Sequence, residues 1–388
     1  MTICFSVSLR PVKIWLLSAA MLFVSLPASA QVIIDLEDGY SIAFESGRLD
    51  PNSYEGEIYQ AVFLEDGEEL ARADRVQLET EGTIDSPDFV LRRLEIDNLQ
   101  ANEDGTEIAI RAVRMRNLPV GWMMQDTEAT PLPAMLAEGN PLSFSIDGLE
   151  ILSPDNGVAI FSTRIATMPT RFDRLANGTV YLQSGGFEIP FIQIVPLGDS
   201  ANAVQFAEWL HGAGLKYIEL SAFSSQTNRL QDGDIITSTS TELRVPDLFG
   251  FLMRLDFALS QANFSILSHP PVTSAQEEAY MDVLLADGRI AEFVMDLRDE
   301  GIMTYLEASE VIPPRAILAF QLEQIASSFL PETGAALSVP ISEFLVQGGQ
   351  LTITATPEQP VSLESLMAAI FLPDFAIQQL NIAIEHQP

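Results

Sequence analysis

Residues 281–297 read MDVLLADGRIAEFVMDL, and this stretch decides the fold class. Its second half, from Ala291 to Leu297, alternates apolar with mostly polar side chains, the pattern of a strand with one buried and one solvated face. The Asp-Gly pair at 287–288 tolerates the positive φ angles of a tight turn. We therefore expect strand, turn and strand over this stretch, the unit of an antiparallel meander.

The same pattern recurs on the N-terminal side of this stretch. Apolar side chains alternate with polar ones around Leu142 to Ile146 and again around Phe251 to Leu259. Turn-forming pairs separate such segments at Asp66-Gly67, Asp104-Gly105, Asn156-Gly157, Asn177-Gly178 and Asp232-Gly233. The sequence therefore predicts a mainly β fold, built as a long twisted antiparallel hairpin meander.

Helical signals are few and concentrate near the C-terminus. A short helix is expected from Asn202 to His211, and another after Pro313-Pro314, with Leu318, Leu322, Ile325 and Phe329 on one face. Ser362 can cap a third helix. Residues 351–355 and 380–384 are typical of strands. We expect a β-rich meander over 31–200, and over 201–388 a further meander with a C-terminal α+β part, in which short amphipathic helices cap the sheet.

The C-terminal third also resembles a known family. The hairpin pattern is followed by GIMTYLE, a long amphipathic helix, GGQLTITATPEQPVSLESLM and the closing NIAIEH. This order, mainly across residues 200–388, is similar to the uncharacterised periplasmic proteins grouped as YdgA-like, and more distantly to the AsmA-like envelope proteins. The resemblance implies a long twisted sheet behind an N-terminal export or anchor segment. It transfers no functional residue.

Residues 1–30 have the composition of a secretory signal peptide. Arg10 and Lys13 precede an apolar run of twelve residues over 15–26, and Ala28-Ser29-Ala30 is a small-x-small cleavage pattern. Cleavage would fall between Ala30 and Gln31. An uncleaved membrane anchor is the alternative, although a spanning helix needs about 20 apolar residues. We predict a periplasmic protein, with an extracellular location as the alternative.

The composition excludes several functions. The chain has 388 residues with 54 acidic and 20 basic side chains, a formal charge of −34. Such a field repels phosphate backbones, which argues against nucleic-acid binding. Glycine motifs that cradle nucleotide phosphates are absent. Cys4, the single cysteine, lies within the signal, so no disulfide is expected. The acidity suits solubility, with a basic partner as the alternative.

The search for catalytic chemistry finds no motif. The chain lacks a Gly-x-Ser-x-Gly elbow, and His211, His269 and His386 lack the spacing of a zinc site. Asp232 and Asp234 could hold calcium weakly, but a hairpin turn explains both better. The carboxylates are too many to single out a pair. We predict no catalytic residue, no metal and no cofactor.

Apolar segments remain as candidate binding sites. Trp122, Met123 and Met124 lie between prolines and could form a patch for a partner or an acyl chain, since methionine adapts to irregular ligands. The alternative is that they fold onto the sheet. Phe187, Ile189, Phe191 and Ile194 are expected in the core rather than in a groove.

Three functions are compatible with this sequence. The first is a non-catalytic envelope protein that binds an amphiphile or an envelope protein partner and contacts the membrane only indirectly or peripherally. The second is a periplasmic hydrolase that uses a carboxylate pair. The third is a structural scaffold for assembly. The first is our leading hypothesis, because strands with one apolar face are abundant and catalytic spacings are missing.

Overall fold

The structure is a computed structural model that describes residues 32–388 apart from 36–39, 51–54, 84–85, 87, 104, 121–134, 268–273, 309–310, 331–332 and 369–372. The predicted signal peptide with its cleavage point between Ala30 and Gln31 lies outside the described residues. The candidate patch Trp122, Met123 and Met124 lies outside them too. Both predictions therefore stay predictions.

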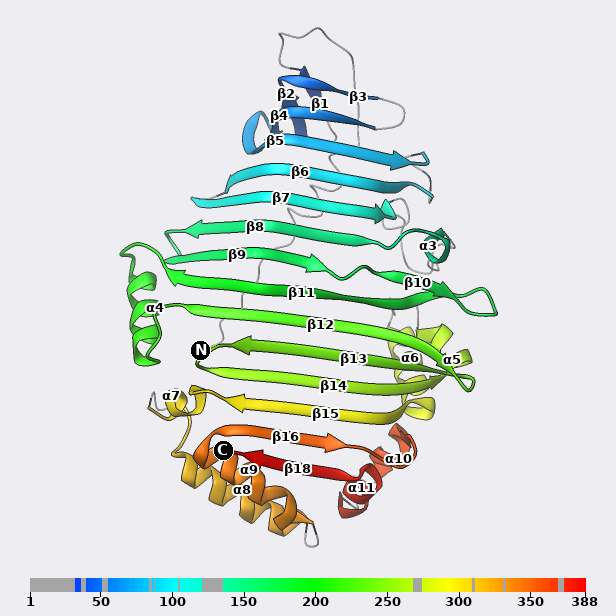
Figure 1. Ribbon diagram of the computed structural model, residues 1–388, viewed down its shortest axis with the longest axis vertical. Helices are drawn as coiled ribbons and strands as arrows, with labels where there is room; N and C mark the ends of the chain where they lie inside the picture. The colour runs from blue at the N-terminus through cyan, green and yellow to red at the C-terminus, as the bar shows by residue number, and fades with distance from the viewer. Residues whose placement is uncertain are drawn as a thin grey trace.

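One large antiparallel sheet forms the body of the molecule (Figure 1). Almost every strand pairs with its neighbours along the chain, as in a meander. The strands are β1 (Val32–Asp35), β2 (Tyr40–Phe44), β3 (Ser46–Leu49), β4 (Gly56–Glu65), β5 (Glu68–Glu81), β6 (Val90–Glu103), β7 (Thr106–Leu118), β8 (Ser143–Ser153), β9 (Val158–Thr167), β10 (Arg171–Arg174), β11 (Val180–Pro196), β12 (Ile218–Gln231), β13 (Asp234–Val245), β14 (Phe249–Ser260), β15 (Arg289–Asp299), β16 (Gly349–Ala355), β17 (Val361–Ser362) and β18 (Ile382–Gln387).

The helices gather at the strand ends and beyond the last strands (Figure 1). They are α3 (Met135–Glu138), α4 (Ala201–Gly212), α5 (Gln261–Leu267), α6 (Ser274–Asp287), α7 (Ile302–Ala308), α8 (Arg315–Phe329), α9 (Gly334–Gln347), α10 (Leu363–Ala368) and α11 (Pro373–Leu380). None of the helices in the described ranges combines the length and the apolarity that a membrane crossing requires. The predicted fold class, mainly β with a C-terminal α+β part, is confirmed.

The hairpin turns follow the predicted chemistry. Asp66 and Gly67 have φ angles of 50° and 86°, and Asp232 and Gly233 have 54° and 92°. Two consecutive positive φ angles define a type I′ turn, whose twist matches that of the flanking strands. These turns set the β4–β5 and β12–β13 registers, in which Glu65 faces Glu68 and Gln231 faces Asp234.

The predicted hairpin over 281–297 is wrong in its first half. The segment up to Asp287 belongs to helix α6, and only Arg289–Asp299 is a strand. Gly288 has no positive φ and makes no turn. A Cβ there would lie 2.4 Å from the Phe257 ring and 2.3 Å from the Leu284 carbonyl oxygen, so glycine allows the helix end to pass close to β14. Close packing, rather than a tight turn, explains this glycine.

Other predicted elements are confirmed with small shifts, the largest at the last strand, which was expected over 380–384 and lies at Ile382–Gln387 after helix α11 ends at Leu380. Helix α4, at Ala201–Gly212, is the helix expected over 202–211. The Ser200 hydroxyl caps it by accepting a hydrogen bond from the Ala203 amide at 3.2 Å. Ser362 caps α10 by accepting from Ser365 N at 3.1 Å. Strands β11 and β12 pair across α4, so the sheet is continuous through the predicted boundary near residue 200.

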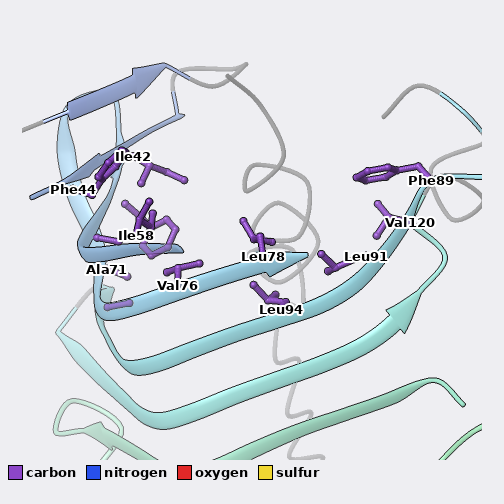
Figure 2. Packing of buried hydrophobic residues seen from close by; sticks show 13 residues of the cluster. Ile42, Phe44, Ile58, Ala71, Val76, Leu78, Phe89, Leu91, Leu94 and Val120 are labelled. Carbon is purple, nitrogen blue, oxygen red and sulfur yellow. The ribbon is translucent and has the colours of Figure 1, made fainter. Parts of the chain in front are cut away.

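Two apolar clusters are buried, one at the β2–β7 end of the sheet and one at the ends of the central strands β11, β13 and β14. The larger one lies where β5, β6 and β7 curve strongly, and its members point to the inside of the curve (Figure 2). It comprises Ile42, Phe44, Ile58, Ala61, Phe63, Ala71, Ala73, Val76, Leu78, Phe89, Leu91, Leu94 and Val120. The smaller cluster joins Leu175, Tyr181, Ile235 and Leu259 to Phe264 of α5.

Candidate functional site: the apolar face of the sheet

The strand registers bring apolar side chains onto one face of the sheet. Residues directly opposite each other in an antiparallel pair share a face. Met253 of β14 faces Met295 of β15, which faces Ile353 of β16. The rows on either side join Phe251, Leu297 and Leu351, and then Leu255, Phe293 and Ala355. We call the surface that contains these rows the apolar face.

The opposite face of the same strands is mostly polar. Arg254 and Asp256 lie there on β14, and Glu292 and Asp296 lie there on β15. Asp296 accepts a hydrogen bond from Gln350 of β16 at 2.5 Å. The polar face is therefore stable in contact with solvent, whereas covering the apolar face would lower the free energy by removing apolar surface from water.

Exposure does not alternate along the central strands, although polarity does. All side chains of β8 are half-buried except Ser153, which is buried. Strand β15 is similar, with most apolar and polar side chains half-buried alike. In a two-layer fold the apolar positions would be buried and the polar ones exposed. In the described part of the chain, therefore, the middle of the apolar face has no second layer over it.

The apolar face continues across the N-terminal strands because the alternation of inward and outward side chains shifts by one residue partway along each strand. On β5, Ala71 and Ala73 belong to the same cluster as Val76 and Leu78, although odd and even positions normally face opposite ways. On β4 the same switch separates Ile58 from Ala61. Each strand inserts one extra outward residue at the switch, so its apolar side chains stay on one side.

These extra residues lie beside one another across the sheet, and we call the row of Gln60, Asp74, Asn98, Arg111 and Gly148 the bend line. Positive φ angles recur on alternate strands, at Gln60 (52°), Asn98 (53°) and Gly148 (66°). Asn98 Nδ2 donates to Asp74 Oδ2 at 2.7 Å, and Gln60 Nε2 donates to Asp74 Oδ1 at 3.5 Å. The bend line makes the strands curve around the apolar face (Figure 2).

The bend line ends at β11. There the register with β12 shifts by one residue between Ile189 and Ile192, which is a β-bulge. On β12 and β13 the alternation is regular, and one further bulge lies between β14 and β15 at Asp256/Phe257. The same face therefore continues from β4 to β18, but a polar band crosses it on β12 and β13, formed by Ser224, Gln226, Thr237, Thr239 and Thr241. Beyond the rows named above, this face carries Ile108, Ile110, Phe144, Ile146, Leu149, Ile151, Ile192, Ile194 and Leu220.

In the part of the chain that the structure describes, helices lie over this face only at its margins. Phe264 of α5 contacts the ring of Tyr181 edge-on at 5.6 Å, above the ends of β11, β13 and β14. At the C-terminal end, Phe344 of α9 packs on the His386 ring of β18. His386 Nε2 hydrogen-bonds the Gly348 carbonyl at 2.8 Å, which ties α9 to the last strand.

An arginine–carboxylate network lies on the polar face, behind the larger apolar cluster. Glu95 lies 2.8 Å from Arg93 and 3.3 Å from Arg116, with Arg75 and Arg114 each at 3.8 Å. The hydrogen bond from Arg93 holds the pKa of Glu95 below its ordinary value. This network keeps Glu95 ionised and links β5, β6 and β7.

Asp97 extends this network along β6. Burial alone would raise the pKa of Asp97, but hydrogen bonds from Arg114 and Arg75 lower it overall. Asp97 Oδ1 accepts from Arg114 Nη2 at 2.6 Å, and Oδ2 accepts from Arg75 Nη1 at 3.0 Å. Both carboxylates of the network are therefore ion-pair partners in the folded protein.

Other sequence-predicted residues are placed as follows. Phe187, Ile189 and Ile194 lie on the apolar face rather than in a core, with Phe187 43% exposed, so the core prediction was wrong for them. Within the described ranges, no second layer packs over the sheet here to bury these side chains. Asp232 forms its predicted hairpin turn, and Asp234 pairs with Arg289 at 2.9 Å. Among the described residues, no group of three His, Cys, Asp or Glu could hold a metal ion.

Sequence reasoning missed the bend line. Its signal is present in the sequence, because the apolar spacing changes from two to three at Ala73 to Val76 and at Ile96 to Leu99. A single break of this kind is ordinary. The same break in successive hairpin-linked strands indicates a coordinated bend.

Comparison with known proteins gives one finding. A family model described as "Uncharacterized protein" matches residues 314–387, the segment from the start of α8 to β18. No curated protein sequence matches the chain. The YdgA-like and AsmA-like resemblance, predicted mainly over residues 200–388, stays a prediction.

Proposed function

We propose that this protein binds an amphiphile, whose hydrocarbon chain lies on the uncovered apolar face of the sheet. The single observation that supports this function is the uniform half-burial of strands such as β8, whose polarity nevertheless alternates. Periplasmic localisation belongs to the same proposal, on the strength of the sequence of residues 1–30.

The chemistry of the face favours a hydrocarbon chain. Each methylene transferred from water to an apolar surface contributes about 0.8 kcal/mol when fully buried. Such a chain needs no hydrogen-bond partner, and the rows that join Met253, Met295 and Ile353 on β14, β15 and β16 offer none, with Thr241 of β13 at their edge. Methionine side chains adapt to irregular ligands.

The experiment compares two neighbouring residues on opposite faces. Met295→Glu places a carboxylate in the middle of the apolar face, whereas Val294→Glu places the same group on the polar face. We expect native mass spectrometry with lipid extraction to find bound amphiphile on the wild-type protein and on Val294→Glu, and none on Met295→Glu. Both variants should keep the wild-type circular dichroism spectrum.

Two results would contradict this proposal. The first is a wild-type protein that reproducibly carries no amphiphile and takes up none of an added fluorescent fatty acid. The second is equal ligand occupancy in both variants. If cross-linking in cells instead returns one stable protein neighbour with no small ligand, the scaffold alternative replaces this function.

The hydrolase alternative has less support. A glycosidase-type acid needs a raised pKa. In the described ranges, the carboxyls whose pKa is shifted, Glu57, Glu95, Asp97 and Asp287, all shift downward and stay ionised. We therefore rank amphiphile binding above catalysis.

A further inference from the structure

Helix α8 carries a concentration of exposed apolar side chains. Ile317, Phe320, Ile325 and Phe329 are 48%, 59%, 57% and 71% exposed, and Val311 just before the helix is 66% exposed. Two members of the apolar face predicted for this helix, Ile325 and Phe329, are thus exposed to solvent. The helix buries Ala319 instead, and α9 lies against that side.

The outward half of α8 carries no charge. This half exposes Ile317, Phe320, Gln321, Gln324, Ile325, Ser328 and Phe329, while Ala316, Glu323 and Ser327 are exposed beside it. The Ser328 hydroxyl donates to the Gln324 carbonyl at 2.8 Å, so its hydrogen bond is made within the helix. The side-chain amides of Gln321 and Gln324 keep their hydrogen bonds only where water or lipid headgroups reach them. Glu323, the one acidic residue of α8, is exposed at the edge of this surface.

The area of this surface does not fit a stable dimer. The four apolar side chains of α8 expose on the order of 450 Å², taking about 200 Å² for a free aromatic side chain. A stable interface needs about 800 Å² from each partner. A lipid bilayer imposes no such minimum, because an amphipathic helix inserts its apolar face into the headgroup boundary.

Charge selects the kind of bilayer. Arg315 is the only basic residue of α8, and Glu307 pairs with it at 2.9 Å. The helix therefore offers no free cation to anionic lipids, and the strongly negative chain is repelled by them. Zwitterionic headgroups carry no such penalty.

We propose that the outward half of α8 lies in the surface of a zwitterionic lipid bilayer. Docking through this surface would bring the apolar face close to a source of amphiphile. This role rests on the proposed function. Helix α9 packs against α8 on one side and against β16 and β18 on the other, so docking through α8 places the last strands of the sheet next to the membrane. The segment matched by the family model, residues 314–387, contains all of these elements.

The test uses the protein as its host processes it, with the N-terminus read by mass spectrometry and shared by all variants. Phe320→Ser combined with Phe329→Ser should lower flotation with phosphatidylcholine vesicles by more than about tenfold, since two aromatic anchors are lost. Leu230→Ser combined with Met281→Ser is the matched control, because these residues are 55% and 52% exposed elsewhere on the molecule. The control should float like the wild type.

A second measurement locates the contact. With Cys4→Ser as background, Ser328→Cys labelled with an environment-sensitive dye should shift to shorter wavelength on vesicle addition, and Gln231→Cys at the β12–β13 turn should not. Adding phosphatidylglycerol to the vesicles should reduce flotation.

Equal flotation of both double variants, or no shift at position 328, would overturn the proposal. So would a Phe320 and Phe329 double variant that floats like the wild type but no longer forms the dimers that the wild type forms in analytical ultracentrifugation. In that case α8 would bind a second copy of the chain. Amphiphile uptake from solution by the Phe320 and Phe329 variant should be unchanged. Failure of this inference is therefore distinguishable from failure of the proposed function, which Met295→Glu tests.

Discussion

At the scale of single residues, the bend line depends on positions that accept a left-handed backbone. Gly148 has φ of 66°, and a Cβ there would lie 2.9 Å from the Cβ of Arg111 on the neighbouring strand. Two costs therefore oppose any side chain at this position: the left-handed conformation and a contact that is too close.

Gly148→Ala should lower the free energy of unfolding by about 2–3 kcal/mol, measured by urea denaturation followed by circular dichroism. Gly67→Ala is the control, because Gly67 also has a positive φ but has open space around it. It should lose only about 1 kcal/mol. Equal losses would mean that the close contact with Arg111 contributes nothing.

A second residue-scale prediction concerns Glu95. Glu95→Gln should destabilise the protein by about 1–2 kcal/mol at pH 7, because charge-assisted hydrogen bonds are lost. The folded-state pKa of Glu95 lies below its ordinary value near 4.5. Its contribution is therefore present above that value and is lost as pH falls through the folded-state pKa.

The difference in stability between wild type and Glu95→Gln should accordingly shrink in urea titrations below about pH 4.5. The control is Glu79→Gln, since the Glu79 side chain is 47% exposed and pairs with one arginine, Arg93 at 3.2 Å, besides accepting from Gln77 Nε2 at 3.2 Å. It should change stability by less than about 0.5 kcal/mol. A difference that persists unchanged at low pH would contradict the assigned role of the Glu95 charge.

At the scale of elements, α8 and α9 pack through small residues. Ser342 donates to the Ala319 carbonyl oxygen at 3.3 Å, and a Cβ on Gly334 would lie 2.6 Å from the Ala326 carbonyl oxygen. The two backbones are therefore close, with no room for larger side chains between them.

Ala319→Leu should destabilise the protein by about 2 kcal/mol through overpacking. Ala316→Leu lies on the exposed side of the same helix and has nearly the same helix propensity, so it should be close to neutral. Thermal denaturation of both variants checks this. An unchanged midpoint for Ala319→Leu would show that the helices can separate without cost.

Elements were predicted well where one period was unambiguous. The Asp-Gly turn at 232–233 and the alternation in β14 specified their strands directly. Residues 281–287 were not predictable in this way, because MDVLLAD fits a helical and an extended period equally. The long-range contact of Gly288 with Phe257, invisible in a local pattern, accompanies the helical outcome.

At the scale of the whole molecule, the sequence predicted one-sided strands but not what lies over them. Leu142, Phe144 and Ile146 would look the same in a sandwich, where another sheet buries them. Whether a second layer exists depends on how segments distant in the sequence pack, and the local alternation of apolar and polar residues does not reveal this. The candidate site was therefore predictable as an apolar face, and its exposure was not.

The single layer predicts an extended shape in solution. Eleven successive pairings from β5 to β18, each about 4.8 Å apart, span roughly 50 Å across the strands. With the terminal elements added, we expect a radius of gyration of about 25 Å by small-angle X-ray scattering. A compact chain of this length would give about 21 Å, and that result would contradict the open sheet.

The near coincidence of chain order and strand order has an evolutionary consequence. A hairpin such as β12–β13 contacts mainly the strands just before and just after it, so its duplication or excision would leave the remaining pairings in place. In this respect the molecule resembles a repeat protein, whose length changes by whole units. Homologues can therefore differ in the width of the sheet by pairs of strands, while the elements at its two ends stay the same.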